Sequence, residues 1–333
     1  MKSNAFTAVA TCFVVAGIMA GAGPAYGDDD AGLCEKQQTV GVEAVSQLIG
    51  ECDFSGITLV VDGAPFAVPE PGHSVVLSAM GDQSATSDDT VVVSRELGNE
   101  VAVFFDGKVI GPVAARAQLQ DSLDDENEPV QVAALPSKCS ASQPYDLYGF
   151  EWYFENYTWK YNNASAPVAS AQSAFAAGAS SMANGSSSTC GALQNGARSI
   201  YGGSTSTASS VSSGGGCTGT DNVNVIGWGA ISSSKVLAYT CNYSFLSEVY
   251  EADMKFDTSG HLWSSAASGC ASGRYDLQGV ATHEFGHAFG LDHVASGTGQ
   301  VMQASTTTCN YAQRQLGYGD QHGMYAMYGS TND

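Results

Sequence analysis

The chain has 333 residues, with 12 basic and 33 acidic side chains and a formal net charge of −21. Such an acidic surface repels nucleic acid and anionic membranes, and the sequence has no basic patch or basic helix, so we expect neither kind of partner. Bulk composition favours a soluble protein, and function has to be sought in specific sites.

The first 27 residues have the pattern of a signal peptide. Lys2 supplies the positive start, residues 8–20 form an apolar run too short to span a bilayer, and Ala25-Tyr26-Gly27 fits a cleavage site between small residues. No later segment approaches 18 uninterrupted apolar residues. We therefore expect a secreted, extracellular protein.

Residues 28–120 predict a small β-rich domain. Ile57–Val61 is a strand candidate, and Val101–Phe105 and Lys108–Ile110 flank an Asp106-Gly107 pair that suits the tight turn of a hairpin. The region contains no catalytic constellation, because His73 stands alone. We interpret it as a propeptide or an accessory domain.

An acidic linker is expected at residues 121–138, where Asp124–Pro129 would be exposed and suited to proteolytic processing. Beyond it, the aromatic-rich segment Tyr145–Tyr161 favours a half-buried strand over a surface that stacks carbohydrate. Ala166–Met182 is rich in alanine and predicts a long helix, and residues 202–216 predict a flexible loop rich in serine and glycine.

The segment His283-Glu284-Phe285-Gly286-His287-Ala288-Phe289-Gly290-Leu291-Asp292-His293 carries the clearest chemistry, because it contains three of the six histidines of the chain. Residues four apart share a helix face, so His283 and His287 can offer two imidazoles to one metal ion. Gly290 can end the helix in a left-handed conformation and return His293 to the same point. A helix without a metal is the alternative, and the extra matches at Gly290 and His293 disfavour it.

Three neutral nitrogens leave the fourth position of a tetrahedral zinc open, which distinguishes catalytic from structural zinc. Glu284 lies about 100° around the helix from His283 and can reach a zinc-activated water. We predict that it acts as the general base and then passes the proton to the leaving amine.

This segment resembles the zinc-binding consensus of the metzincin metallopeptidases, and within them most closely that of the matrixins. The resemblance covers residues 145–330 and implies that Met302 forms the methionine turn beneath the ligands. It also implies strands at Asn222–Gly229 and Val236–Thr240, and a C-terminal helix within Leu316–Gly329. Glu251–Asp257 would be the edge strand that binds extended substrate.

Some features depart from the matrixin pattern. Gln303-Ala304 follows Met302 in place of Tyr-Pro, and His261 is the only histidine between residues 241 and 282, so no loop for a second zinc is present. We predict one zinc ion. The usual proline-arginine-cysteine-glycine activation sequence is absent, which leaves the latency mechanism open. Calcium oxygens could come from three aspartates, but nothing specific supports calcium binding: Asp253, Asp257 and Asp320.

Eight cysteines remain once Cys12 leaves with the signal peptide, and an even number in an exported chain predicts four disulfides. We expect the pairs Cys34–Cys52, Cys190–Cys217, Cys241–Cys270 and Cys139–Cys309, although eight cysteines allow 105 pairings. A latent form in which Cys139 caps the zinc as a thiolate is disfavoured, because the even number leaves no free cysteine.

The fold predicted from these features is α+β. A metzincin-like catalytic domain, with a mixed sheet, an active-site helix and a methionine turn, would occupy residues 139–333 and follow the small β-rich domain. We predict a monomeric, exported zinc endopeptidase that acts on proteins or peptides. The propeptide interpretation of residues 28–120 is favoured because an exported peptidase needs restraint before release.

Two alternative functions are compatible with a zinc site. A zinc hydrolase whose third ligand is a glutamate on a second helix is weak, because no glutamate follows Glu284. The other alternative is an exported, non-catalytic binding or adhesive protein that keeps zinc for structural reasons. The presence of Glu284 and the open fourth position disfavour it.

Overall fold

The computed structural model describes residues 39–47, 56–85, 90–97, 100–111, 137–153, 156–185 and 187–329. The predicted signal peptide and most of the acidic linker lie outside these ranges. Within them, helices are few and sheets dominate, so the predicted mixed α+β class is confirmed. No helix in the described part of the chain has the length and apolar character needed to cross a membrane.

A mixed sheet of ten strands forms the centre of the molecule, in the order β7-β6-β5-β4-β11-β12-β10-β8-β9, with β15 paired to β4. Its strands are β4 (His73–Asp82), β5 (Val91–Arg95), β6 (Val101–Phe105), β7 (Lys108–Ile110), β8 (Asn156–Tyr161), β9 (Arg198–Ser204), β10 (Val225–Gly229), β11 (Val236–Phe245), β12 (Glu248–Asp257) and β15 (Ser305–Thr306). Two smaller sheets consist of β1 (Thr39–Gly41), β2 (Thr58–Val61) and β3 (Ala64–Ala67), and of β13 (Leu262–Ser264) and β14 (Arg274–Asp276).

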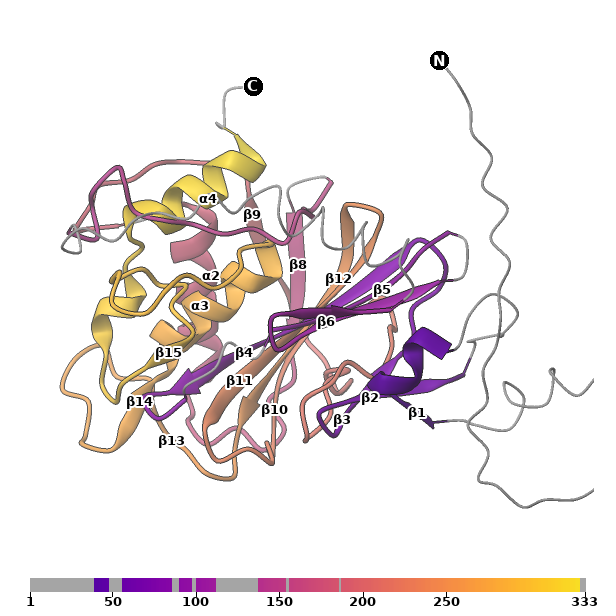
Figure 1. The fold of residues 1–333 in the computed structure, drawn as a ribbon. Coiled ribbons are helices and arrows are strands. Elements are labelled where there is room, and N and C mark those ends of the chain that lie inside the picture. The colour runs from indigo at the N-terminus through magenta and orange to yellow at the C-terminus, as the bar shows by residue number, and fades with distance from the viewer. Residues whose placement is uncertain are drawn as a thin grey trace, which may run out of the picture.

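The N-terminal strands β4 to β7 extend the sheet that carries the C-terminal strands (Figure 1). The junction is an antiparallel pairing of β4 with β11, which runs from His73 opposite Phe245 to Gly81 opposite Val236. The expected β-rich region is therefore divided, because β1 to β3 form a small sheet of their own while β4 to β7 belong to the large sheet. Its separation from the rest of the chain as a domain remains a prediction.

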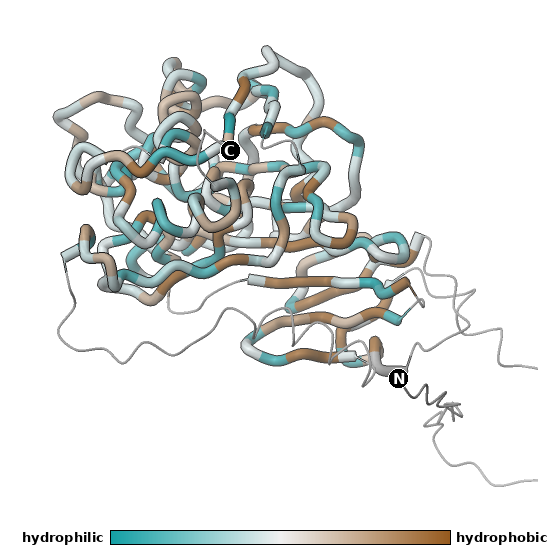
Figure 2. The backbone as a smooth tube through the Cα atoms, turned by 90° about the horizontal axis from the view of Figure 1, so that it is seen from above, coloured by the Kyte–Doolittle hydropathy of each residue, from teal (hydrophilic) through white to brown (hydrophobic). Residues whose placement is uncertain are grey.

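Three α-helices lie together on one side of the sheet: α2 (Ala171–Ala183), α3 (Leu277–Phe289) and α4 (Tyr318–Tyr328) (Figure 1). Two short 3-10 helices, η2 (Val42–Gln47) and η3 (Tyr311–Arg314), complete the described elements. Hydrophobic stretches recur along the strands (Figure 2). Their buried side chains form two cores, one on each face of β4 and β11. Phe175, Phe256 and Phe285 belong to the core beneath the helices.

Several predicted elements are confirmed. The hairpin turn places Asp106 and Gly107 at φ 51° and 66°, as a turn of the primed type requires. The expected alanine-rich helix is α2, and the C-terminal helix is α4. In the described part of the aromatic-rich segment the strand is β8, and residues 202–204 belong to β9 and not to a loop.

The prediction that Glu251–Asp257 forms the substrate-binding edge strand is wrong. This segment lies within β12, which pairs with β11 on one side and β10 on the other, so it has no free edge. Strand order depends on contacts between distant parts of the chain, and local sequence does not encode it. The strand that neighbours β12 on the side of the added N-terminal strands is β11.

The predicted disulfide pairs are also wrong wherever the structure describes them. The bonds join Cys139 to Cys190, Cys217 to Cys241, and Cys270 to Cys309. Cys139 is therefore not a free thiolate above a metal. The predicted Cys34–Cys52 pair lies outside the described residues.

Disulfide mapping checks this correction. Digestion without reductant, followed by mass spectrometry, should find Cys217 linked to Cys241. The double variant Cys217→Ala/Cys241→Ala should unfold more easily by about 2–4 kcal/mol in denaturant titration, because the unfolded chain regains the freedom that the bond removes. A peptide linking Cys190 to Cys217 would contradict the pairing.

Candidate metal centre

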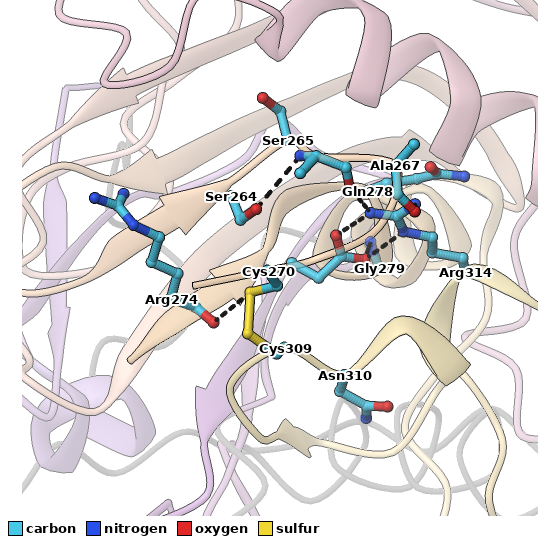
Figure 3. Close-up of polar contacts among 12 residues, drawn as sticks. Ser264, Ser265, Ala267, Cys270, Arg274, Gln278, Gly279, Cys309, Asn310 and Arg314 are labelled. Atoms are coloured by element: carbon cyan, nitrogen blue, oxygen red, sulfur yellow. Dashed lines mark hydrogen bonds and ion pairs between the residues drawn. A yellow bond between two sulfur atoms is a disulfide. The ribbon is translucent and has the colours of Figure 1, made fainter. Parts of the chain in front are cut away.

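The helix that carries the histidines begins and ends at well-defined caps. The Asp276 side chain accepts a hydrogen bond from the Gly279 backbone amide at 3.0 Å, as an N-cap residue does. Arg314 forms an ion pair with Asp276 and lies beside this helix start (Figure 3). At the other end, Gly290 has φ 109°, the left-handed conformation expected from the sequence. The chain therefore turns away from the axis of α3 before residue 293.

The turn brings His283, His287 and His293 to one point. Their Nε2 atoms lie 2.9 Å apart between His287 and His283, 3.0 Å between His287 and His293, and 3.2 Å between His283 and His293. These are the three residues of the described chain whose ligand atoms could together hold a metal ion. Two Zn–N bonds of 2.0–2.1 Å at a tetrahedral angle would separate the nitrogens by about 3.3 Å, so the set fits zinc.

The outer ring nitrogens support this fit. His283 Nδ1 lies 2.8 Å from the Val301 carbonyl oxygen, and His287 Nδ1 lies 2.9 Å from that of Leu291. A proton on each Nδ1 can be donated to these oxygens, which leaves the Nε2 lone pairs free for a metal. Burial, together with repulsion from the other two histidines, lowers the pKa of His287 well below its usual value and keeps it neutral.

Glu284 lies on the same helix and is fully buried. Its Oε2 accepts a hydrogen bond of 2.5 Å from the Thr240 hydroxyl on β11, while Oε1 makes no hydrogen bond to a described residue. Burial raises the pKa of Glu284 to about 8, against the opposing effects of Thr240, His293 and the Met80 backbone amide. A buried carboxylate with one oxygen still to be partnered is suited to bind and deprotonate a water.

Met302 lies directly beneath the histidine-bearing helix, as the resemblance implied. A Cβ atom at Gly286 would come within 2.3 Å of its sulfur, so the Met302 side chain occupies its present position because residue 286 has no side chain. The backbone around Met302 also supports the histidines, because the Met302 carbonyl accepts from the Val294 amide at 2.9 Å. Its role as the methionine turn remains a proposal supported by this packing.

Asp320 on α4 holds this turn in place, a role that we did not predict. Its carboxylate accepts backbone hydrogen bonds from Val301 at 2.8 Å, Met302 at 3.1 Å and Gly317 at 2.7 Å. Burial raises its pKa to about 6, against these three bonds. The carbonyl of Val301 in turn faces His283, so Asp320 acts on the histidine through the turn. Its position three residues into a glycine-initiated helix was the available sequence signal.

Two further residues near His287 were missed. Asn242 on β11 donates from its side-chain amide to the His287 carbonyl oxygen at 2.9 Å. The Tyr148 hydroxyl lies 3.0 Å from His287 Nδ1 and also contacts the Ser78 hydroxyl on β4. These contacts join residues about 45 to 140 positions apart, so no local pattern indicates them.

The aspartates considered as calcium ligands do not form a common site in the described chain. Asp253 accepts from the backbone amides of Ser210 and Val225, and Asp257 accepts from those of Ile231 and Gly260. Both carboxylates are buried and accept hydrogen bonds from backbone amides. A structural role for these aspartates therefore explains their positions, and calcium remains unsupported.

Comparison with known proteins gives one family. Residues 232–329 match the family model described as Peptidase_M10, matrixin. The predicted matrixin resemblance is thereby confirmed for a segment that begins just before β11 and ends just after α4. The match does not reach residues 145–231, which we had included. No curated protein matches the chain.

We expect Asp320→Ala to destabilise the protein and loosen the metal centre. The change leaves three buried backbone amides without an acceptor, so the free energy of unfolding should fall on the order of 2–3 kcal/mol. Because Val301 would lose its anchor, zinc should also be released at a lower chelator concentration. Denaturant titration and a chelator titration measure the two effects.

Glu70→Ala is the control, because it removes the same charge from an exposed position. It should change neither quantity measurably. Wild-type zinc retention in Asp320→Ala would contradict the support that we assign to this residue.

Proposed function

Because residues 232–329 match the matrixin family, we propose that the chain is a zinc-dependent endopeptidase that hydrolyses peptide bonds in proteins. The observation that carries the proposal is the convergence of three histidine Nε2 atoms within 3.2 Å beside the half-partnered carboxylate of Glu284. A site built only for structure would need a fourth protein ligand, and no fourth group lies with these three in the described chain.

In this proposal His283, His287 and His293 hold the ion. Zinc, when bound, supplies Lewis acidity that polarises the peptide carbonyl and makes water a stronger acid. Glu284 takes the proton of the attacking water on its carboxylate and delivers it to the nitrogen of the leaving amine. Thr240 fixes the carboxylate rotamer through Oε2, which keeps Oε1 directed to the water.

The remaining properties follow from the sequence and stay proposals. The signal-like start and the three disulfides support export to the extracellular space. One zinc ion is expected, because the only metal-competent histidine cluster in the described residues is the one on and after α3. His261 is engaged elsewhere, with its Nδ1 at 2.9 Å from Asp257.

The assignment is tested by separating metal binding from chemistry. Glu284→Gln should retain zinc but lose most of the chelator-sensitive hydrolysis of casein, because an amide cannot accept the proton of water. His287→Ala should lose zinc itself, because two imidazoles remain. Metal analysis and a casein digest, performed on protein freed of its N-terminal region by processing, measure both.

His261→Ala is the matched control, since it removes a histidine that lies outside the metal centre. It should keep both zinc and activity. Full activity in Glu284→Gln or His287→Ala would refute the proposed function.

A further inference from the structure

The side chains of the metal centre are buried in the structure. His283, Glu284 and His287 are fully buried, and His293 is 7% exposed. An endopeptidase has to admit an extended protein segment to these groups. These groups are therefore covered by other residues of the chain, which lie where such a segment would have to enter.

Strand β4 lies at that place. It pairs antiparallel with β11, where Ser78 is opposite Thr240, the residue that holds Glu284. At its far end β4 pairs in parallel with β15, the short strand that follows Met302. The Gly81 amide donates to the Ala304 carbonyl at 2.9 Å, and the Asp82 amide donates to the Lys235 carbonyl at 2.7 Å. β4 is thus hydrogen-bonded on both sides, between the two segments that border the metal centre.

The side of β4 that faces α3 contacts the site itself. The Ser78 hydroxyl contacts Tyr148, whose hydroxyl lies 3.0 Å from His287 Nδ1. A second contact follows β4, because Thr90 donates to Asp292, next to His293, at 3.3 Å.

We propose that β4 (His73–Asp82) is an intramolecular inhibitor that holds the peptidase latent by adding a strand to β11 and filling the substrate position. The proposal rests on the proposed function. A peptide that adds to a sheet edge binds through its main chain, and β4 already uses the main-chain groups of β11 that a substrate would need. Access therefore requires β4 to leave.

Packing explains why β4 remains in place. Val75, Leu77 and Ala79 lie in one hydrophobic core, and Val76 and Met80 lie in the other. Leaving would expose both faces of the strand, at a cost of about 25 cal/mol for each Å² of apolar surface. Processing in the region before Lys138 would weaken this hold by releasing the N-terminal region from the chain that carries α3.

The test compares two lysine substitutions on β4 in the zinc-loaded full chain. Ser78 is fully buried and faces Tyr148, so Ser78→Lys places an unpaired charge in the interior and should displace the strand. Ser74→Lys is the matched control, because Ser74 is partly exposed near the other end of β4. Casein hydrolysis should rise at least about tenfold in Ser78→Lys, as a modest population shift produces, and stay at the wild-type level in Ser74→Lys.

Access is measured without catalysis by two further readouts. A peptide hydroxamate that ligates zinc should bind Ser78→Lys but not the wild-type full chain, and hydrogen exchange of the β11 amides should be faster in Ser78→Lys. If Ser78→Lys fails to fold, as loss of amide protection in α3 would reveal, Gly81→Pro replaces it. That change removes the amide that bonds Ala304 and disturbs only the end of β4.

Different outcomes refute different claims. Tight hydroxamate binding or full casein hydrolysis by the wild-type chain would overturn the inhibitory role of β4. So would an unopened site in the folded variants, or self-cleavage within His73–Asp82 on zinc loading, which would make β4 a substrate. If the opened variant binds the hydroxamate but hydrolyses no casein, the closure by β4 stands and the proposed peptidase function fails.

Discussion

The structure depends on burying a helix that carries three ionisable side chains. His283, Glu284 and His287 on α3 are fully buried, and a buried polar group is costly unless it has a partner. Backbone carbonyls of Leu291 and Val301 serve the two imidazoles, and Thr240 serves the carboxylate. The turns and strands around α3 place these partners beside the buried side chains. The histidine Nε2 atoms and one carboxylate oxygen of Glu284 remain available, in our proposal, to a metal ion and a water.

This constraint gives β11 two roles. One set of its side chains, Thr240 and Asn242, supports α3, while its backbone pairs with β12 on one side and β4 on the other. The strand nearest the chemistry is therefore also the strand to which the N-terminal region attaches. The hydrogen bonds between β4 and β11 therefore extend the sheet and, in our proposal, also cover the metal centre.

The sequence predicted what depends on neighbouring residues. The spacing of His283, His287 and Gly290 specified the helix, its end and the return of His293, because helical periodicity and a left-handed cap act within a few residues. The Asp106-Gly107 turn was predicted for the same reason. The disulfide partners and the support of the turn by Asp320 were missed, because they follow from the order in which distant strands and helices pack.

The burial of β4 could be predicted in part, because the sequence carries a signal for a strand buried on both faces. Val75-Val76-Leu77-Ser78-Ala79-Met80 is a nearly continuous apolar run, the pattern of a strand buried on both faces and not of one with a solvated face. This apolar run indicates that other elements cover both faces of the strand. It does not indicate which elements cover it. The first cover is the core that β4 shares with β1 to β3. The second cover is the core that includes α3, so the hydrophobicity of β4 is itself an argument that the N-terminal region folds onto the segment that carries the histidines and not apart from it.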